Sequence, residues 1–232
     1  MQKRLLALVL LFACTQINAQ KKEWTSLFDG KTTSGWHTYG KDAVGEAWKV
    51  IDGTLMLDPS QKEGWQIKGG GDIVSNESYG DFHLQLEWKI SKNGNSGIIF
   101  FIQDEPKKYN YIWYTGPEMQ VLDNDGHADG KIIKHRAGNL YDLVAGVEGA
   151  VKPVGEWNLV DIINEKGTLT LKLNGITTVT TTLGDDAWKA LIKNSKFSKG
   201  ESPDFGKVFT GHIGLQDHGN QVWYRNIRIQ RL

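Results

Sequence analysis

Cysteine is almost absent from this chain of 232 residues. The one cysteine, Cys14, lies in an apolar stretch near the N-terminus. The rest of the chain therefore cannot contain a disulfide, a thiolate nucleophile or a cysteine metal site. Its length is sufficient to bury a sizeable core without such cross-links.

An excess of charge of either sign is also absent. Lys and Arg together number 27, as do Asp and Glu, and no block of like charge stands out. This balance gives no indication of a nucleic-acid groove or a basic membrane face, so we expect no nucleic-acid partner. The sequence also lacks a GxSxG elbow, a phosphate-binding P-loop and a dinucleotide fingerprint, so those motifs support no function here.

The beginning of the chain has the three parts of an export signal. Lys3 and Arg4 are followed by the apolar run 5–13, which is too short to span a bilayer. A cleavage pattern of small residues then ends at Ala19. We predict a signal peptide over residues 1–19, no transmembrane helix, and an exported, periplasmic protein with a single domain over residues 20–232. In an alternative interpretation, Cys14 is the lipidated N-terminus of a membrane-anchored protein.

Short apolar-alternating runs separated by turn dipeptides make up most of the chain. Residues 82–90 alternate as a half-buried strand does, and residues 97–102 are continuously apolar, as in a central strand. Asp52-Gly53 and Asn174-Gly175 each separate two such runs, which is typical of two-residue hairpins. One short helix is expected over residues 185–193. The pattern predicts an all-β jelly-roll sandwich of two antiparallel sheets with one short helix.

Tryptophan is abundant, with nine residues in the chain. Large aromatic side chains commonly fill the core of a sandwich, and we expect this of most of them. A few on the curved face of a sheet could instead stack on sugar rings, because flat aromatic and apolar sugar faces match.

The segment 114–129 carries the most informative polar residues. If a strand begins near Glu118, then Gln120 and Leu122 share its face with Glu118. A β-bulge after Gln120 would instead bring Asp123 beside the other two polar residues. Two carboxylates in such a row could act as base and acid on a sugar. An edge strand with solvated polar residues and an ordinary turn explains the same sequence.

Two histidines follow this segment. His127 and His135, with the nearby aspartates, could be metal ligands, but no tight ligand spacing is present, and a solvated loop is the simpler interpretation. Residues 123–126 do not continue into a calcium-binding loop. A divalent cation such as calcium is possible, yet the sequence shows no ligand set for it.

Further candidates lie in turns and near the C-terminus. In the segment 211–220, Gln216, Asp217 and His218 would end a strand, and His218 could act as acid, base or oxyanion partner near neutral pH. Arg225 could bind a carboxylate or a substrate oxygen, although such arginines often form structural pairs. Asn95, in the glycine-containing turn 93–97, could donate to a substrate.

The order and spacing of short motifs over the whole chain after the signal peptide resemble one known family, the 3-keto-disaccharide hydrolases. They include EMQVLDN at 118–124 and GLQDHG at 214–219; each motif alone is weak, and their order and spacing together are specific. Further matching segments are residues 24–31, 35–36, 82–88, 95–97, 138–141, 155–158, 173–175 and 225–229.

This resemblance implies a concanavalin A-like jelly roll that cleaves 3-keto-glycosides. The C3 ketone acidifies the C2 proton, so a base could abstract it and the C1 substituent could leave by β-elimination, with water addition giving net hydrolysis. The matching residues suggest Glu118 as the base and Asp123 or His218 as the acid. The expected substrate-binding residues are Gln120, Asn95, Gln216, Arg225 and His127, and the expected partner is an oligosaccharide or glycoside.

Two alternatives remain at this point. The spacing of Glu118, Gln120 and Asp123 is similar to the E-x-D-x-x-E strand of laminarinase-type retaining glucanases, although the middle acid is here an amide and the last acid is shorter. A non-catalytic, lectin-like carbohydrate-binding module would use the same fold and the same tryptophans without needing a base and an acid.

Overall fold

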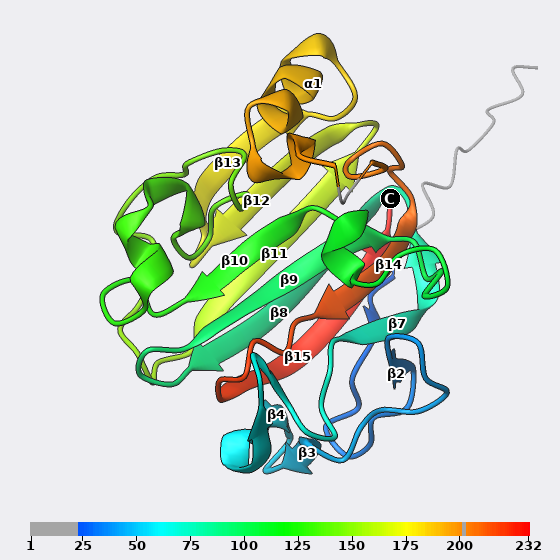
Figure 1. Cartoon of the computed structure of the whole chain (residues 1–232), viewed down its shortest axis with the longest axis vertical. Helices are drawn as coiled ribbons and strands as arrows, with labels where there is room; N and C mark the ends of the chain where they lie inside the picture. The colour runs from blue at the N-terminus through cyan, green and yellow to red at the C-terminus, as the bar shows by residue number, and fades with distance from the viewer. Residues whose placement is uncertain (1–22, 201–202) are drawn as a thin grey trace, which may run out of the picture.

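The computed structural model describes residues 23–200 and 203–232, so the predicted signal peptide and the Cys14 anchor lie outside the described residues. Two antiparallel sheets pack face to face (Figure 1). The larger sheet has the order β13 (Ile176–Thr182), β12 (Thr168–Leu173), β11 (Asn158–Glu165), β8 (Phe82–Ile90), β15 (Val222–Arg231), β4 (Thr54–Leu57) and β3 (Trp48–Ile51), and β1 (Thr25–Ser26) also pairs with β15. The smaller sheet has the order β10 (Glu118–Leu122), β9 (Asn95–Ile102), β14 (Gly211–Leu215), β7 (Ile73–Tyr79) and β2 (Trp36–Thr38).

Short elements connect and flank these sheets. β5 (Lys62–Glu63) and β6 (Gln66–Ile67) form a hairpin of their own, and α1 (Asp186–Lys193) is the single α-helix of the described residues. The 3₁₀ turns are η1 (Pro59–Gln61), η2 (Ile112–Tyr114), η3 (Ala128–Lys131), η4 (Ile133–His135) and η5 (Lys196–Ser198). The all-β prediction with two antiparallel sheets and one short helix is confirmed.

Local sequence signals explain the turns and the helix start. Asp52 and Gly53 have φ of 49° and 71°, and Asn174 and Gly175 have φ of 52° and 82°, as a type I′ hairpin turn requires at both central positions. The carboxylate of Asp185 accepts a hydrogen bond from the backbone N–H of Trp188 at 2.7 Å and so caps α1. Both predicted hairpins and the predicted helix are therefore confirmed.

The core lies between the inner faces of the two sheets. β8 buries every second residue from Phe82 to Ile90, as its alternation predicts, and β9 is buried along its whole length. A bulge in β9 places Phe101 at φ 61° opposite β14, so Phe100 and Phe101 both join the core and their rings meet at 5.3 Å. This bulge lies in β9, whereas the sequence suggested one after Gln120, in the neighbouring strand β10.

The register of β10 decides which of its side chains face outward. The strand pairs with β9 residue by residue from Glu118 to Leu122. Met119 and Val121 point into the core, so Glu118 and Gln120 face away from it. The alternative with a bulge after Gln120 is wrong, because the pairing shows no shift there.

The outer edge of β10 is covered by the segment 138–141. The backbone of Gln120 exchanges hydrogen bonds with this segment, accepting from Gly138 N at 2.9 Å and donating to Asn139 O at 3.1 Å. Tyr141 N donates to Glu118 O at 2.9 Å. The covering segment therefore delivers the side chain of Tyr141 next to Glu118.

No helix of the described residues is long and apolar enough to cross a membrane.

Candidate active site

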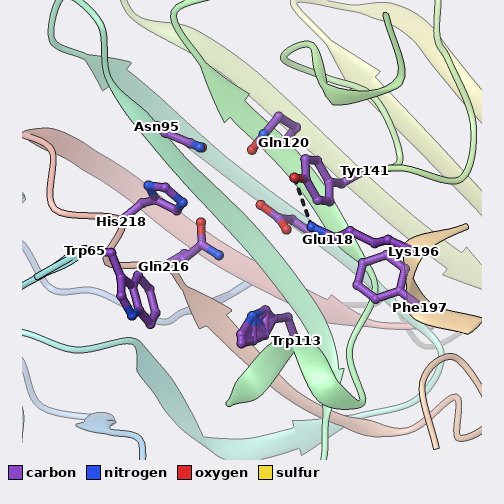
Figure 2. A pocket seen from close by; sticks show the side chains of 10 residues that line it. All are labelled: Trp65, Asn95, Trp113, Glu118, Gln120, Tyr141, Lys196, Phe197, Gln216 and His218. Atoms are coloured by element: carbon purple, nitrogen blue, oxygen red, sulfur yellow. Dashed lines mark hydrogen bonds between the residues drawn. The ribbon is translucent and has the colours of Figure 1, made fainter. Parts of the chain in front are cut away.

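A pocket with about 570 Å³ of empty space opens on the outer face of the smaller sheet. Glu118 occupies its middle, and side chains from several separate parts of the chain surround that carboxylate (Figure 2). The lining residues are Trp65, Asn95, Trp113, Glu118, Gln120, Tyr141, Lys196, Phe197, Gln216 and His218.

Glu118 lies over a strand position that has no side chain. A Cβ atom at Gly97 would come within 2.0 Å of Oε1 of Glu118, so only glycine leaves room for this carboxylate. The residue is 6% exposed. Burial raises the pKa of Glu118 to about 8, against the opposing charge of Lys196. Such a carboxyl is a much stronger proton acceptor, once ionised, than an exposed glutamate.

Three buried amide side chains surround the carboxylate. Gln120 and Gln216 flank Gly97 on either side, because Gln120 is the register partner of Gly97 and Gln216 N donates to its carbonyl at 3.0 Å. Asn95 completes the set, and its Oδ1 is buried without a donor among the described residues. Amides in such positions can donate to or accept from sugar hydroxyls and so orient a ring.

Tyr141 and Lys196 form one wall of the pocket and were not predicted from the sequence. Nζ of Lys196 donates to the hydroxyl of Tyr141 at 3.0 Å, and this hydroxyl donates to Oδ2 of Asp129 at 3.2 Å. Burial, with the charges of Glu118 and Asp129, raises the pKa of Tyr141 well above its ordinary value. The phenol therefore stays protonated, and the ammonium is the charged donor of this wall.

The opposite wall is aromatic. The rings of Trp65 and Trp113 lie 6.4 Å apart and nearly parallel, and Tyr111 contacts both. Trp65 is 40% exposed, unlike Trp88 and Trp188, which are fully buried in the core. This wall offers the kind of flat surface on which sugar rings stack.

His218 stands beside Trp65, with the two rings 5.9 Å apart. Burial lowers the pKa of His218 below its ordinary value, with help from the neighbouring His127. The imidazole is therefore mostly neutral at pH 7, and its protonated form is a stronger acid than an exposed histidine. The adjacent Asp217 is fully buried and accepts from Ile67 N at 3.0 Å and Gly71 N at 2.8 Å, which ties the hairpin that carries Trp65 to the segment that carries His218.

Three predicted site residues lie outside this pocket. The carboxylate of Asp123 accepts from three backbone N–H groups, those of Asn93, Asp125 and Gly126, at 2.7–3.2 Å, so it fastens two turns together and does not stand beside Glu118. The missing bulge is the reason, since Asp123 follows the end of a regular strand.

Arg225 belongs to the larger sheet and donates twice to Oε2 of Glu87, at 3.1 and 2.6 Å, with its guanidinium over the ring of Trp157. It is a structural pair on the other side of the molecule. His127 does not line the pocket either, although its ring lies 6.0 Å from that of His218. Its Nδ1 accepts from Asp129 N at 3.2 Å and caps η3.

A comparison with known families identifies the chain. The family model of the 3-keto-alpha-glucoside-1,2-lyase-like domain matches residues 23–230 of the sequence. The chain belongs to this family. A 3-keto-disaccharide hydrolase of Bacteroides thetaiotaomicron is 37% identical to it over 94% of this chain and 81% of that protein.

Solved structures agree with the assignment to the lyase-like family. A Parabacteroides distasonis protein, provisionally classed as a glycosyl hydrolase, is 31% identical with a TM-score of 0.80 over 90% of this chain and 94% of its own. A Bacillus subtilis protein with a galectin-like fold has a TM-score of 0.54 at 13% identity over 90% of this chain and 94% of its own, which supports the fold alone. The predicted family, the jelly-roll fold and the glycoside-cleaving enzyme are confirmed.

Residues 23–200 and 203–232 contain no cluster of side chains of the kind that binds a metal ion. Within them, no three His, Cys, Asp or Glu side chains form a group that could hold an ion. Of these four residue types, Glu118 and His218 are the two in the pocket lining, and the divalent cation that the sequence left possible stays a prediction.

Proposed function

We propose that this enzyme cleaves glycosides whose C3 hydroxyl has been oxidised to a ketone, by β-elimination across C1 and C2. The observation that supports this most is the buried carboxylate of Glu118, which has a raised pKa and lies at the centre of a pocket lined by amide and aromatic side chains. Removal of a proton from a carbon next to a ketone requires such a strong, desolvated base.

The first step is removal of the C2 proton. Glu118 takes the proton, the electrons of the C2–H bond form a C2–C3 double bond, and the carbonyl electrons move to the C3 oxygen. The product is an enolate. Asn95, Gln120 and Gln216 hold the sugar hydroxyls so that C2 faces Glu118.

The second step expels the C1 substituent. The C3 carbonyl re-forms, the electron pair moves to C1–C2, and the C1–O bond breaks with its electrons on the leaving oxygen. His218, in its protonated form, is the side chain of the aromatic wall that can supply a proton to that oxygen. Addition of water, with hydroxyl at C1 and hydrogen at C2, then gives the products of hydrolysis.

The pocket offers less support for a retaining glycosidase. That mechanism needs a second carboxyl group about 5 to 5.5 Å from the first. Among the described residues, Glu118 is the one carboxylate of the pocket lining, and Asp123 is engaged with backbone N–H groups elsewhere.

A direct assay tests the proposal. Purified protein, stripped of metal ions and then supplied again with divalent ions, is given a 3-keto-glucoside and its unoxidised parent, and released sugar and enone absorbance are followed together. We expect cleavage of the keto substrate alone. We expect Glu118→Gln to lose turnover at least about 1000-fold and Glu156→Gln, at an exposed loop position, to keep it.

Other outcomes of this assay decide between the alternatives. Cleavage of the parent glucoside would indicate an ordinary glycosidase. Sugar binding without any cleavage would indicate a lectin-like module. Near-normal turnover by Glu118→Gln would remove Glu118 as the base. A requirement for the restored ions would place a metal in the reaction.

A further inference from the structure

We propose that Lys196 binds the C3 carbonyl oxygen of the substrate and neutralises the enolate, and that Tyr141 positions its ammonium for this role. The proposal rests on the proposed function and assigns the recognition of the ketone, which distinguishes this substrate class from ordinary glycosides. It concerns two residues that come from separate loops and meet beside Glu118 (Figure 2).

The hydrogen bonds leave the ammonium free to donate to a ligand. Tyr141 uses its own proton on Asp129 and accepts one proton from Lys196. An ammonium carries three protons, so two are left for an oxygen in the pocket. Its Nζ also lies 4.2 Å from the centre of the Tyr141 ring, which adds a cation–π contact.

The main chain holds Lys196 at this place as firmly as its side chain does. The backbone N–H of Lys196 donates to Oδ2 of Asp142 at 2.6 Å, and Oδ1 of Asp142 lies 3.0 Å from Nε2 of His135. Asp142 adopts φ 57°, a left-handed conformation that is uncommon for a non-glycine residue. His135 packs on the Tyr141 ring at 4.3 Å. These contacts restrain an exposed lysine at the mouth of the pocket, a restraint typical of functional positions.

The layout of the pocket matches the order of atoms in the sugar. Glu118 lies between the Lys196–Tyr141 wall and the side of His218 and Trp65 (Figure 2). In the substrate, C2 likewise lies between C3 and C1. A sugar with C2 at Glu118 and its leaving group against His218 and Trp65 therefore presents its C3 oxygen to Lys196. The ammonium of Lys196 in the pocket lining then meets the oxygen that becomes negative in the enolate.

The competing interpretation is that Lys196 only balances the charge of Glu118 or binds any hydroxyl. Among the charges that act on Glu118, that of Lys196 has the largest effect on its pKa. A charge-balancing role would alter the ionisation of Glu118 and leave the stabilisation of the enolate untouched. The two interpretations therefore differ in a reaction that stops at the enolate.

The test uses the 3-keto derivative of 1,5-anhydroglucitol, which has hydrogen in place of the exocyclic C1 substituent and so has no glycosidic leaving group to expel. Exchange of its C2 proton in D₂O, followed by NMR against an enzyme-free control, measures enolate formation alone. The pH dependence is measured for each variant, so a changed ionisation of Glu118 is separated from a changed plateau rate.

We expect Lys196→Gln to lower the plateau kcat of exchange about 100-fold, the usual effect of removing one donor to an oxyanion, with a smaller change in KM. Lys196→Arg keeps the charge and is expected to retain exchange within about tenfold of the wild type. Tyr141→Phe is expected to fall between them. Lys193→Gln, in the same segment but outside the pocket lining, is the matched control and should exchange normally.

The outcomes separate this proposal from the proposed function. Exchange that depends on Glu118 but stays within about threefold of the wild-type plateau in Lys196→Gln would overturn the role of Lys196 and leave the function standing. A plateau that is unchanged while only its pH midpoint moves would assign Lys196 to charge balance and also overturn it. Absence of Glu118-dependent exchange in the wild type would overturn both.

Discussion

Glu118→Gln tests the electrostatics of the pocket through stability, independently of any substrate. The folded protein raises the pKa of this carboxyl from its ordinary 4.5 to about 8, chiefly by burial. The folded state therefore favours the protonated form, and the stability associated with it is present below about pH 4.5 and is lost as the pH rises towards 8. At about 1.4 kcal/mol for each tenfold change in the ionisation constant, the shift from 4.5 to about 8 makes this loss on the order of 5 kcal/mol.

Glutamine has nearly the same shape and is neutral at every pH, so the variant escapes this loss. We expect nearly equal stability at pH 4.5, and a variant that is more stable than the wild type by roughly 5 kcal/mol at pH 9, or about 15 °C in melting temperature. Thermal unfolding at both pH values measures this. Asp72 is also buried, with a pKa raised to about 7 chiefly by desolvation, and its charge contributes to the raised pKa of Glu118. A difference in melting temperature that is the same at pH 4.5 and pH 9 would refute the assigned burial cost.

Three further predictions concern the same site. Gly97→Ala places a carbon 2.0 Å from Oε1 of Glu118 and so displaces the base. A displacement of about 1 Å should lower turnover about 100-fold. Gly80→Ala, whose added carbon meets its nearest atom at 3.0 Å, is the control and should keep normal kinetics. C2 proton exchange should rise about tenfold per pH unit up to about pH 8, the pKa of Glu118, and then level off; exchange that falls between pH 6 and pH 8 would contradict Glu118 as the base. Asp123→Ala should lower the melting temperature by about 5 °C, because three backbone N–H groups lose their acceptor, and should leave kcat unchanged; a large loss of kcat at full stability would return Asp123 to the catalytic set.

Local chemistry determined the parts of the fold that the sequence predicted. The Asp52-Gly53 and Asn174-Gly175 turns require positive φ at both positions, and few residues other than Asn, Asp and Gly tolerate it. The alternation of residues 82–90 is strict because one face of β8 is in the core and the other is in water. The same two-residue period placed Glu118 and Gln120 together on the outer face of β10.

The residues that sequence reasoning missed or misplaced depend on long-range structure. Asp123 was grouped with Glu118 through a bulge that β10 does not have, while the actual bulge at Phe101 has no marker in the sequence. Lys196 reaches the pocket from a turn 55 residues beyond Tyr141, and no periodicity indicates which loop folds over which strand. Tyr141 could have been found, since it closes the 138–141 motif that contributed to the family resemblance.

The segment 138–141 has a consequence for aggregation that is separate from catalysis. β10 is the last strand of its sheet, and an uncovered last strand offers free N–H and C=O groups on which another chain can add a strand. By occupying the groups of Glu118 and Gln120, the segment that carries Tyr141 also closes this edge. Changes that loosen this segment are therefore expected to produce self-association as well as slow turnover. Solubility and activity are linked here by one stretch of backbone.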